Sequence, residues 1–335
     1  MAMSDDAILD VQDLRVRFPV FGGVIPRKKA EVRAVDGVSL TLRRGETIGL
    51  VGESGCGKTT VGRAIVNILR AMNYRVEVEG RILYHHPEGP VDLAALSRRE
   101  MRRYRADLQM VFQDPYASLN PRMTVGSIIE EPLRIHTAQT KEERRARVRW
   151  LLEKVRLSPD HARRYPHEFS GGQRQRIGIA RALATNPKIV IADEPVSALD
   201  VSIQAQVINL MQDLQEEFGL SYVFISHDLS VVRHIANRIF VMYLGAIVEA
   251  GPADEVYSRP VHPYSRMLLS AVPRPDPEAR RARVARLRDD LPSPLKKPSG
   301  CAFHTRCPIA RADCASHTPP LEPRDGRAVA CPYAE

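Results

Sequence analysis

Short apolar runs alternate with segments of helical periodicity along most of this chain. Four of the runs hold few polar side chains, which is typical of strands buried on both faces of a sheet. They lie at residues 47–51, 108–112, 189–193 and 222–225. Apolar positions recur at helical spacing in residues 61–69, 125–157, 171–183 and 200–218. The pattern therefore predicts an α/β fold with parallel strands in its core.

Toward its two ends the chain departs from this pattern. Residues 8–18 alternate imperfectly between apolar and polar positions, and with a second run at 34–42 they predict a long hairpin with an exposed face. Further strands are predicted at residues 80–84, 238–243 and 246–248, a polar helix at 98–103, and two short helices between 252 and 272. Prolines and arginines then indicate a linker or an extended arm before a cysteine-rich tail. No internal repeat is present, so we expect a single unit rather than a tandem pair.

Composition and charge narrow the picture only a little. The 335 residues are 44% hydrophobic and 27% charged, as in an ordinary globular protein, and the formal net charge is +9. A basic balance fits nucleic acid, an anionic membrane face or a solvated surface, and the dispersed charges favour the last, apart from an arginine run at 280–288. The acidic N-terminus lacks the features of a signal peptide, and no apolar stretch approaches the roughly 18 residues of a spanning helix. We therefore expect any work at a membrane to be done from the cytosolic side and through partners.

A glycine-rich stretch stands between the first apolar run and the helical pattern after it. Its spacing is G-x-x-x-x-G-K-[ST], met by Gly52, Gly57, Lys58 and Thr59. Glycines let successive backbone N–H groups turn toward phosphate oxygens, and the following helix directs the positive end of its dipole at the same anion. Lys58 can reach the β- and γ-phosphates, and the Thr59 hydroxyl can bind Mg²⁺. A plain connecting turn is the alternative, and the Lys-Thr pair at this offset argues against it. The residues expected around the phosphates are Gly52, Glu53, Ser54, Gly55, Cys56, Gly57, Lys58, Thr59 and Thr60.

Two further polar groups follow apolar elements farther along the chain. Ser170 can cap the helix that begins after it, and Gly171 and Gly172 leave the start of that helix open to a second anion.

Asp193 and Glu194 end a predicted parallel strand, at the sheet edge where ligands bind. Asp193 is therefore expected in the Mg²⁺ shell and Glu194 as the general base on water, with a surface pair of acids as the alternative.

His227 and Phe18 are two further candidates. His227 follows the apolar run at 222–225 and could reach a γ-phosphate, although a lone histidine is more often structural. Phe18 could stack on an adenine ring, with a core or surface phenylalanine as the alternative.

Taken together and in this order, the motifs resemble those of the ATP-binding subunit of ABC transporters. They are the phosphate loop at 52–59, Gln113, the signature Ser170-Gly171-Gly172-Gln173, the Asp193-Glu194 pair, residues 197–200 and His227. The resemblance covers about residues 8–250 and departs at Phe169, where the family usually has Leu. It implies a P-loop NTPase (RecA-like) core with an antiparallel β-subdomain and an α-helical signature subdomain at about 120–185. A nucleotide-binding domain would span residues 1–258, and a C-terminal cysteine-rich extension would span residues 259–335.

The same resemblance implies how the motifs act. Lys58 and the loop amides would hold the phosphates, while Thr59, Gln113 and Asp193 would surround Mg²⁺. Glu194 would polarise the attacking water, and His227 would contact the γ-phosphate and hold Glu194 and the water in register. In this family two cassettes enclose two ATP molecules head to tail. The residues serving the partner's nucleotide would be Ser170, Gly171, Gly172 and Gln173, with Asp200 at the interface. ATP would favour closure of the pair and hydrolysis would release it.

A narrower resemblance is to the oligopeptide and dipeptide importer branch. It rests on residues 113–123 (QDPYASLNPRM), on 262–264 (HPY) with 268–273, and on the cysteine tail. The long first hairpin is similar to the F-type subunit more than to the D-type. This branch implies an ATPase that powers peptide import, with a paralogous second cassette, two permease subunits contacted by residues 113–123, and an extracytoplasmic solute-binding protein. The chain would then be peripheral, on the cytoplasmic face of the inner membrane.

Four cysteines crowd the tail with the spacing C-x5-C-x6-C-x16-C, at Cys301, Cys307, Cys314 and Cys331. Four thiolates suit structural Zn²⁺ or an iron-sulfur cluster, and the spacing matches neither usual motif. His304 and His317 are spare zinc ligands, and four free thiols are the remaining alternative. The importer branch carries a comparable tail associated with a [4Fe-4S] cluster, so the resemblance favours iron-sulfur.

Other functions remain open from the sequence. Nickel and glutathione are solutes of the same branch, and the cassette does not itself touch the solute. An ABC-type ATPase acting on nucleic acid is a second class, opposed by the single cassette, the missing coiled-coil pattern and residues 113–123. An exporter cassette is a third, although those are often fused to spanning helices. We expect no nucleic-acid partner.

Overall fold

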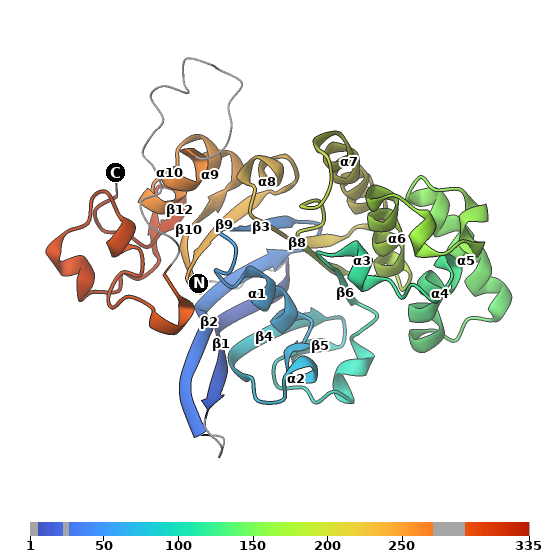
Figure 1. Ribbon diagram of the computed structural model, residues 1–335, viewed down its shortest axis with the longest axis horizontal. Coiled ribbons are helices and arrows are strands. Elements are labelled where there is room, and N and C mark those ends of the chain that lie inside the picture. Colours follow the sequence, from blue (N-terminus) through green and yellow to red (C-terminus); the bar gives the residue numbers. More distant parts are fainter. Residues whose placement is uncertain (1–5, 23–26, 271–291, 335) are drawn as a thin grey trace. The chain divides into compact units, whose positions relative to one another are not determined.

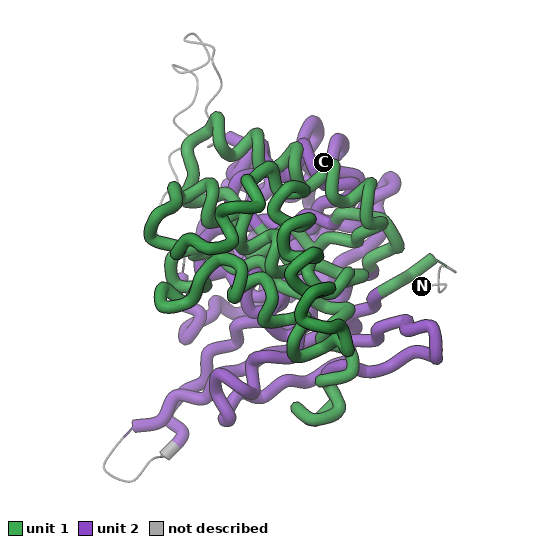
Figure 2. The backbone as a smooth tube through the Cα atoms, turned by 90° about the vertical axis from the view of Figure 1, so that its right-hand side faces the viewer, with its two compact units in different colours: residues 1–8, 42–47, 96–225 green, residues 9–41, 48–95, 226–335 purple. Residues whose placement is uncertain are grey.

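The computed structural model describes residues 6–22, 27–270 and 292–334. The chain divides into two compact units that are interleaved in the sequence (Figure 2). Unit 1 comprises residues 1–8, 42–47 and 96–225, and unit 2 comprises residues 9–41, 48–95 and 226–335. The arginine run at 280–288 lies outside the described residues.

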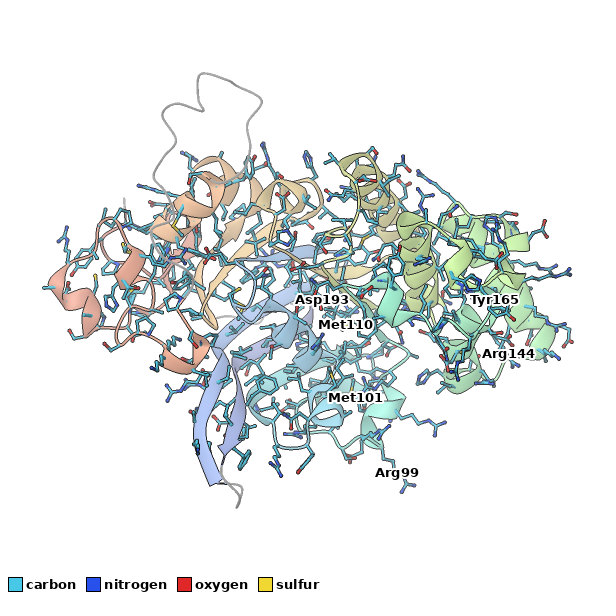
Figure 3. The ribbon with its side chains drawn as sticks, in the orientation of Figure 1. Arg99, Met101, Met110, Arg144, Tyr165 and Asp193 are labelled. Atoms are coloured by element: carbon cyan, nitrogen blue, oxygen red, sulfur yellow. The ribbon has the colours of Figure 1, made fainter. Side chains whose placement is uncertain are left out.

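Unit 1 contains three parallel strands, of which β6 and β8 are labelled in Figure 1. They are β6 (Leu108–Val111), β7 (Ile189–Asp193) and β8 (Ser221–Ser226). Ile189 of β7 pairs with Leu108 on one side and with Ser221 on the other. Every residue of β7 and β8 is buried, as the uninterrupted apolar runs predicted for strands covered on both faces. Asp193 stands at the end of β7 (Figure 3).

The helices of unit 1 follow and separate these strands. They are α3 (Pro115–Ser118), α4 (Val125–His136), α5 (Lys141–Lys154), α6 (Gly171–Leu183) and α7 (Val201–Phe218). The helical pattern over 125–157 corresponds to two helices, α4 and α5, because Thr140 and Glu143 form a capping box that begins α5. The polar helix predicted at 98–103 is only a 3₁₀ turn, η1 (Glu100–Arg103). Two further 3₁₀ turns, η2 (Pro159–Arg163) and η3 (Pro166–Glu168), precede α6.

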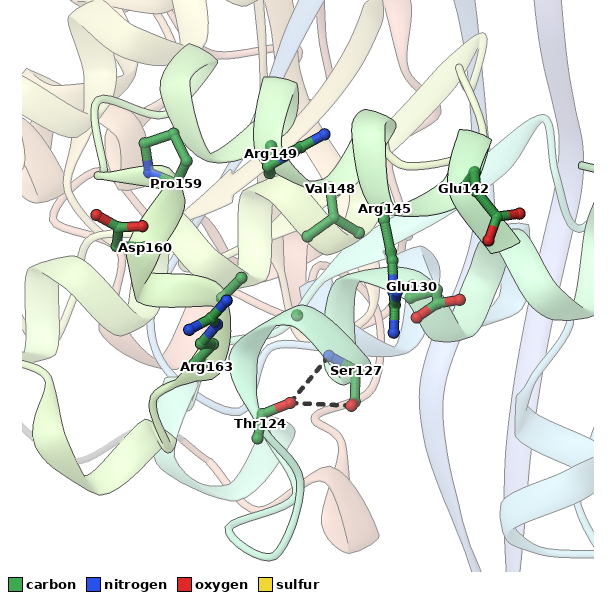
Figure 4. Close-up of a pocket in the computed structure, with 12 residues that line it drawn as sticks. Thr124, Ser127, Glu130, Glu142, Arg145, Val148, Arg149, Pro159, Asp160 and Arg163 are labelled. Atoms are coloured by element: carbon green, nitrogen blue, oxygen red, sulfur yellow. Dashed lines mark hydrogen bonds between the residues drawn. The ribbon is translucent and has the colours of Figure 1, made fainter. Parts of the chain in front are cut away.

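A pocket of about 740 Å³ opens among α4, α5 and η2 (Figure 4). Its rim holds both signs of charge. The acids are Glu130, Glu142 and Asp160, and the bases are Arg145, Arg149 and Arg163. Thr124, the N-cap of α4, accepts a 3.3 Å hydrogen bond from the Ser127 backbone at the edge of this pocket.

Unit 2 contains an antiparallel sheet of order β2-β1-β4-β5. The strands are β1 (Ala7–Gly22), β2 (Arg27–Arg43), β4 (Glu77–His86) and β5 (Gly89–Asp92). The long hairpin predicted from residues 8–42 is confirmed. Its strands extend beyond the predicted runs. In β1 the first three residues are all buried, and buried and more exposed positions alternate imperfectly after them.

The part of unit 2 that carries the glycine-rich stretch at 52–59 contains a mixed sheet. Strand β3 (Thr47–Val51) pairs in parallel with β9 (Arg238–Tyr243), which pairs antiparallel with β10 (Ala246–Pro252). The C-terminal extension continues this sheet, because β12 (Arg327–Val329) pairs with β10 and β11 (Glu322–Arg324) pairs with β12.

Short helices complete unit 2. They are α1 (Lys58–Ile65), α2 (Leu69–Met72), α8 (Leu229–Ile235), α9 (Ala253–Ser258) and α10 (Pro263–Ser270), with 3₁₀ turns η4 (Pro294–Lys296), η5 (His304–Arg306) and η6 (Ala312–Ala315). Phe303 of the extension is 2% exposed and packs edge-on against Tyr243 and Tyr264, which gives the extension a shared core with the sheet. In the part of the chain that the structure describes, no helix has both the length and the apolar character needed to cross a membrane.

Candidate functional site

The phosphate loop connects β3 to α1, as the sequence predicts. Gly57 has a φ of 110°, and a Cβ built there would lie 2.1 Å from the Ala34 carbonyl oxygen. Gly52 is equally confined, since its Cβ would lie 2.2 Å from the Met242 carbonyl oxygen. Neither position accepts a side chain, so the loop can curl only with glycine there. No side chain caps α1, which leaves its first backbone N–H groups directed into the loop.

Lys58 lies inside the curve of the loop. It is 4% exposed, and its Nζ donates to the carbonyl oxygens of Gly52 at 2.8 Å and Glu53 at 3.0 Å. A buried ammonium held by carbonyl groups places a positive charge within the loop. Cys56 is buried beside it, and burial raises the pKa of its thiol, which makes Cys56 a packing residue of the loop.

Glu53 makes contacts that the sequence analysis did not predict. Its carboxylate accepts two hydrogen bonds from the Arg306 guanidinium, with Nη1 to Oε2 at 2.8 Å and Nη2 to Oε1 at 2.9 Å. Its backbone N–H donates to the Tyr264 hydroxyl at 2.9 Å. Both partners belong to the C-terminal part of unit 2, 211 and 253 positions along the chain. The Glu53 carboxylate raises the pKa of Arg306 above its ordinary value.

The turn that carries Tyr264 is fixed by a buried carboxylate. Glu249 of β10 is fully buried and accepts backbone N–H bonds from Val261 at 3.0 Å and His262 at 2.9 Å. His262 in turn accepts the Tyr264 backbone N–H on its Nδ1 at 3.1 Å. Burial lowers the pKa of His262 to about 3, so its ring is neutral and available as an acceptor. The HPY sequence is the signal that could have pointed to this turn.

In unit 1, Glu194 and Gln113 are in direct contact. Gln113 Nε2 donates to Glu194 Oε2 at 3.0 Å. Glu194 follows β7 with a φ of 45°, an unusual conformation for a residue with a side chain, and its backbone N–H donates to the Ile225 carbonyl at 3.0 Å. Glu194 is 8% exposed and Asp193 is 1% exposed. The structure therefore brings together Gln113 and the predicted carboxylate pair at the end of a parallel strand.

The signature turn begins α6 as predicted. Ser170 is its N-cap, and the reciprocal bonds are Gln173 N to Ser170 Oγ at 3.3 Å and Ser170 N to Gln173 Oε1 at 3.0 Å. A Cβ on Gly172 would lie 2.6 Å from Ile203, so α6 can pack closely against α7 only with glycine there. Phe169 is 3% exposed, so it is a buried apolar residue, as expected of the leucine that the family usually has at this position. The capped turn leaves Ser170 exposed at the surface of unit 1.

The segment after Gln113 is bound to the signature helix. The Arg174 guanidinium lies 3.8 Å from the centroid of the Tyr116 ring, and Arg181 Nη1 donates to the Ser118 carbonyl at 2.6 Å. Arg174 Nε also donates to the Pro166 carbonyl at 2.7 Å. Tyr116 is 63% exposed, so the segment presents an aromatic side chain to the surface while α6 holds its backbone.

The remaining predicted site residues are Asp200, His227 and Phe18. Asp200 is the exposed N-cap residue of α7, and its side chain makes no cap bond. His227 is exposed after β8 and belongs to unit 2, whereas Glu194 belongs to unit 1. Phe18 is half-buried on β1. Their contacts with nucleotide or partner stay predictions.

The four tail cysteines lie in one part of the extension. Burial raises the pKa of Cys301 and of Cys307. The nearby Cys314 and Cys331 raise the pKa of both thiols further. The Cys301 backbone N–H donates to the Cys314 carbonyl at 2.8 Å. Within residues 292–334 and the rest of the described chain, no group of three or more His, Cys, Asp or Glu side chains is arranged to hold a metal ion. The expected four-thiolate ligand set is therefore not assembled in this structure.

A phosphate loop after a buried strand, a carboxylate pair after a parallel strand and a capped glycine turn define a P-loop ATPase of the cassette class. Comparison with protein families identifies the same class. The family described as "ABC transporter" matches residues 35–197, and "Oligopeptide/dipeptide transporter, C-terminal region" matches residues 248–314. The chain belongs to the ABC transporter family, in the branch that carries this C-terminal region.

Curated relatives match over nearly the whole chain. The oligopeptide transport ATP-binding protein AppF of Bacillus subtilis is 52% identical over 98% of both chains. OppF of Salmonella typhimurium is 52% identical over 97% of this chain and 95% of its own. The di/tripeptide transport ATP-binding protein DppF of Pseudomonas aeruginosa is 48% identical over 98% of both.

Solved structures of the same fold cover the cassette. CbiO1 of Clostridium perfringens, part of the transporter complex cbiONQ, has a TM-score of 0.62 at 26% identity and covers 76% of this chain and 92% of its own. The cassette MJ0796, in a dimer bound to ADP and Pi, has a TM-score of 0.61 at 29% identity and covers 73% and 98%.

Proposed function

We propose that this chain hydrolyses ATP to power the import of di- or oligopeptides across the cytoplasmic membrane. As a member of the ABC transporter family it is an ATPase coupled to transport. The observation that carries the mechanism is the 3.0 Å bond between Gln113 and Glu194, because it holds a buried carboxylate at the end of β7, where a water can be polarised. The peptide assignment is supported by relatives that are 48% to 52% identical and are named as peptide transport proteins.

We assign the site residues according to their chemistry. Lys58 and backbone amides of the loop bind the phosphates of ATP, and Glu194 orients the attacking water. Thr59, Gln113 and Asp193 offer hydroxyl, amide and carboxylate oxygens, a donor set that fits Mg²⁺. When bound, Mg²⁺ neutralises charge that develops on the phosphates. His227 contacts the γ-phosphate and Phe18 stacks on the adenine ring.

The chain works with partners. Membership of the family implies a second cassette and membrane permeases. We propose that the second cassette is a paralogue bound head to tail, so that residues 170–173 and Asp200 complete its ATP site, and that an extracytoplasmic solute-binding protein acts through the permeases. The chain is then peripheral, on the cytoplasmic face of the inner membrane. The division into a cassette at 1–258 and an extension at 259–335 belongs to the same proposal.

The permease contact is proposed for residues 113–123 and the pocket beside them. The exposed Tyr116 lies on α3, eight positions before Thr124, the first residue that lines the pocket. Both the segment and the pocket belong to unit 1. Acidic and basic side chains around a pocket of about 740 Å³ suit a polar peptide segment. Since Arg174 and Arg181 tie residues 116–118 to the signature helix, movement of that helix is passed to the docked segment.

For the cysteine extension we propose an iron-sulfur cluster, with zinc as the alternative. The support is the presence of four cysteines between positions 301 and 331 of the sequence, a number that suits either. The role is structural or redox-sensing, because peptide import needs no electron transfer. Anaerobic purification followed by iron, sulfide and zinc analysis tests it, and stoichiometric zinc without iron would reject the cluster.

Transport is tested by reconstituting the chain with its membrane subunits, second cassette and solute-binding protein in liposomes. Hydrolysis stimulated by di- or oligopeptides, with uptake, is the expected result. Stimulation by nickel or glutathione alone would replace the peptide assignment by another solute of the same branch. Salt-dependent DNA binding that changes the ATPase rate would favour the nucleic-acid class instead. The F-type assignment predicts that the second cassette is a D-type paralogue in a neighbouring reading frame.

A further inference from the structure

Glu53 is held at each of its polar groups. The carbonyl accepts from Lys58 at 3.0 Å, the N–H donates to Tyr264, and the carboxylate accepts both Nη atoms of Arg306. Lys58 belongs to the loop itself, whereas Tyr264 and Arg306 come from the extension. Together Glu53, Tyr264 and Arg306 form what we call the Glu53 clamp.

The clamp is largely buried, and neighbouring residues of unit 2 hold Tyr264 and Arg306 in place. The side chains of Arg306 and Glu53 are 3% and 22% exposed, so their ion pair is shielded from solvent. A two-pronged pair of this kind fixes the orientation of both planar groups as well as their distance. Tyr264 is fully buried on the turn that Glu249 and His262 hold. Arg306 ends the 3₁₀ turn η5, which follows the buried Phe303.

The phosphate loop needs such support. Its glycines give it the curled backbone that phosphates require, and the same glycines make that shape costly in conformational entropy. A loop held in the binding shape before the ligand arrives binds more tightly, because less ordering remains to be done. The clamp acts on the second residue of the loop, next to the Gly52 carbonyl that Lys58 also contacts.

We propose that Arg306 and Tyr264 are positioning residues for ATP, so that the C-terminal extension preorganises the phosphate loop through Glu53. The inference rests on the proposed binding of ATP by residues 52–60. It assigns the extension a task at the nucleotide site that needs no metal. Neither residue touches the nucleotide, and both act through Glu53.

The test compares ATP affinity and steady-state kinetics of full-length variants. Arg306→Gln removes the charge, Arg306→Lys keeps the charge without the two-pronged geometry, and Tyr264→Phe removes only the hydroxyl. The matched control is Lys297→Gln, which breaks another ion pair between the extension and the rest of unit 2, at 2.8 Å from Asp36. Melting temperatures of all variants separate loss of fold from loss of positioning.

The expected result is a rise of about tenfold in the Kd and KM for ATP in Arg306→Gln, with kcat changed little, because a loop that holds phosphate equally in ground and transition states governs binding alone. Arg306→Lys should recover part of the affinity, and Tyr264→Phe should weaken it less than Arg306→Gln. The double variant Arg306→Gln with Glu53→Gln should be no worse than Arg306→Gln alone, since the two side chains act as a pair. Lys297→Gln should bind ATP as the wild type does.

Two results would overturn the proposal in distinguishable ways. In the first, the wild type binds ATP and Lys58→Ala loses ATP binding, but the folded variants Arg306→Gln and Tyr264→Phe bind ATP as the wild type does. The clamp is then not a positioning device. In the second, Lys58→Ala binds ATP as well as the wild type does. The proposed nucleotide site is then wrong, and so is the positioning role of the clamp.

Discussion

Replacing the Glu194 carboxylate by an amide tests the chemistry of the site most directly. Glu194→Gln keeps the size of the side chain and should keep its place. The backbone is held independently of the carboxylate, since the Glu194 N–H donates to Ile225 and its carbonyl accepts the Ser197 hydroxyl at 3.1 Å. The amide oxygen can still accept the bond from Gln113. We therefore expect the variant to fold and to bind ATP.

The rate of hydrolysis should fall steeply. An amide cannot accept a proton from water, and removal of a positioned general base costs about 10² to 10⁴ in rate, or about 3 to 5 kcal/mol in the barrier. Phosphate release by the assembled transporter measures the rate, and fluorescent or calorimetric titration measures ATP binding. Glu46→Gln is the matched control, because Glu46 is also a glutamate of unit 1 that is 8% exposed and it accepts a backbone bond, from Arg43 at 2.9 Å. A Glu194→Gln variant that hydrolysed ATP at nearly the wild-type rate would refute the assignment of the base.

Three further predictions concern the loop, the pH dependence and the extension. Gly57→Ala should abolish measurable ATP binding, because its Cβ would meet the Ala34 carbonyl at 2.1 Å, whereas Gly89→Ala, at another positive φ in open space, should bind normally in the same titration. Since burial lowers the pKa of His262 to about 3, the unfolded state takes up the proton first, and its contribution to the free energy of unfolding is lost as pH falls from about 6.5 toward 3, at up to about 1.4 kcal/mol per pH unit. Denaturant titrations across this range should therefore give a shallower fall for His262→Asn than for the wild type, and equal slopes would contradict the assignment. Phe303→Ala should lower the free energy of unfolding by about 3 to 5 kcal/mol in the same titrations at neutral pH, and a loss below that of a surface substitution would place Phe303 outside the core.

The strands and the phosphate loop could be predicted from the sequence because their signals are local. The apolar run at residues 47–51 coincides with β3, the run at 108–112 is one residue longer than β6, and the run at 222–225 is one residue shorter than β8 at each end. The Ser170 cap depends on residues within one helical turn, and the glycine spacing of the loop depends on residues 52–59 alone. The boundary between α4 and α5 is set by the capping box at Thr140 and Glu143, which interrupts the helical pattern over 125–157.

The contacts that join distant segments were decided by the tertiary structure alone. Nothing in the loop sequence identifies Arg306, 253 positions away, as the partner of Glu53, or Tyr264 as the acceptor of its N–H. The bond from Gln113 to Glu194 likewise requires β6 and β7 to lie side by side. The cysteine spacing suggested a ligand set, whereas the described residues assemble none. Backbone conformation and burial pattern depend mainly on neighbouring residues, so the sequence by itself determined the loop and its strands. Ion pairs and hydrogen bonds depend on how the chain packs, so only the folded structure determined what holds Glu53 in place.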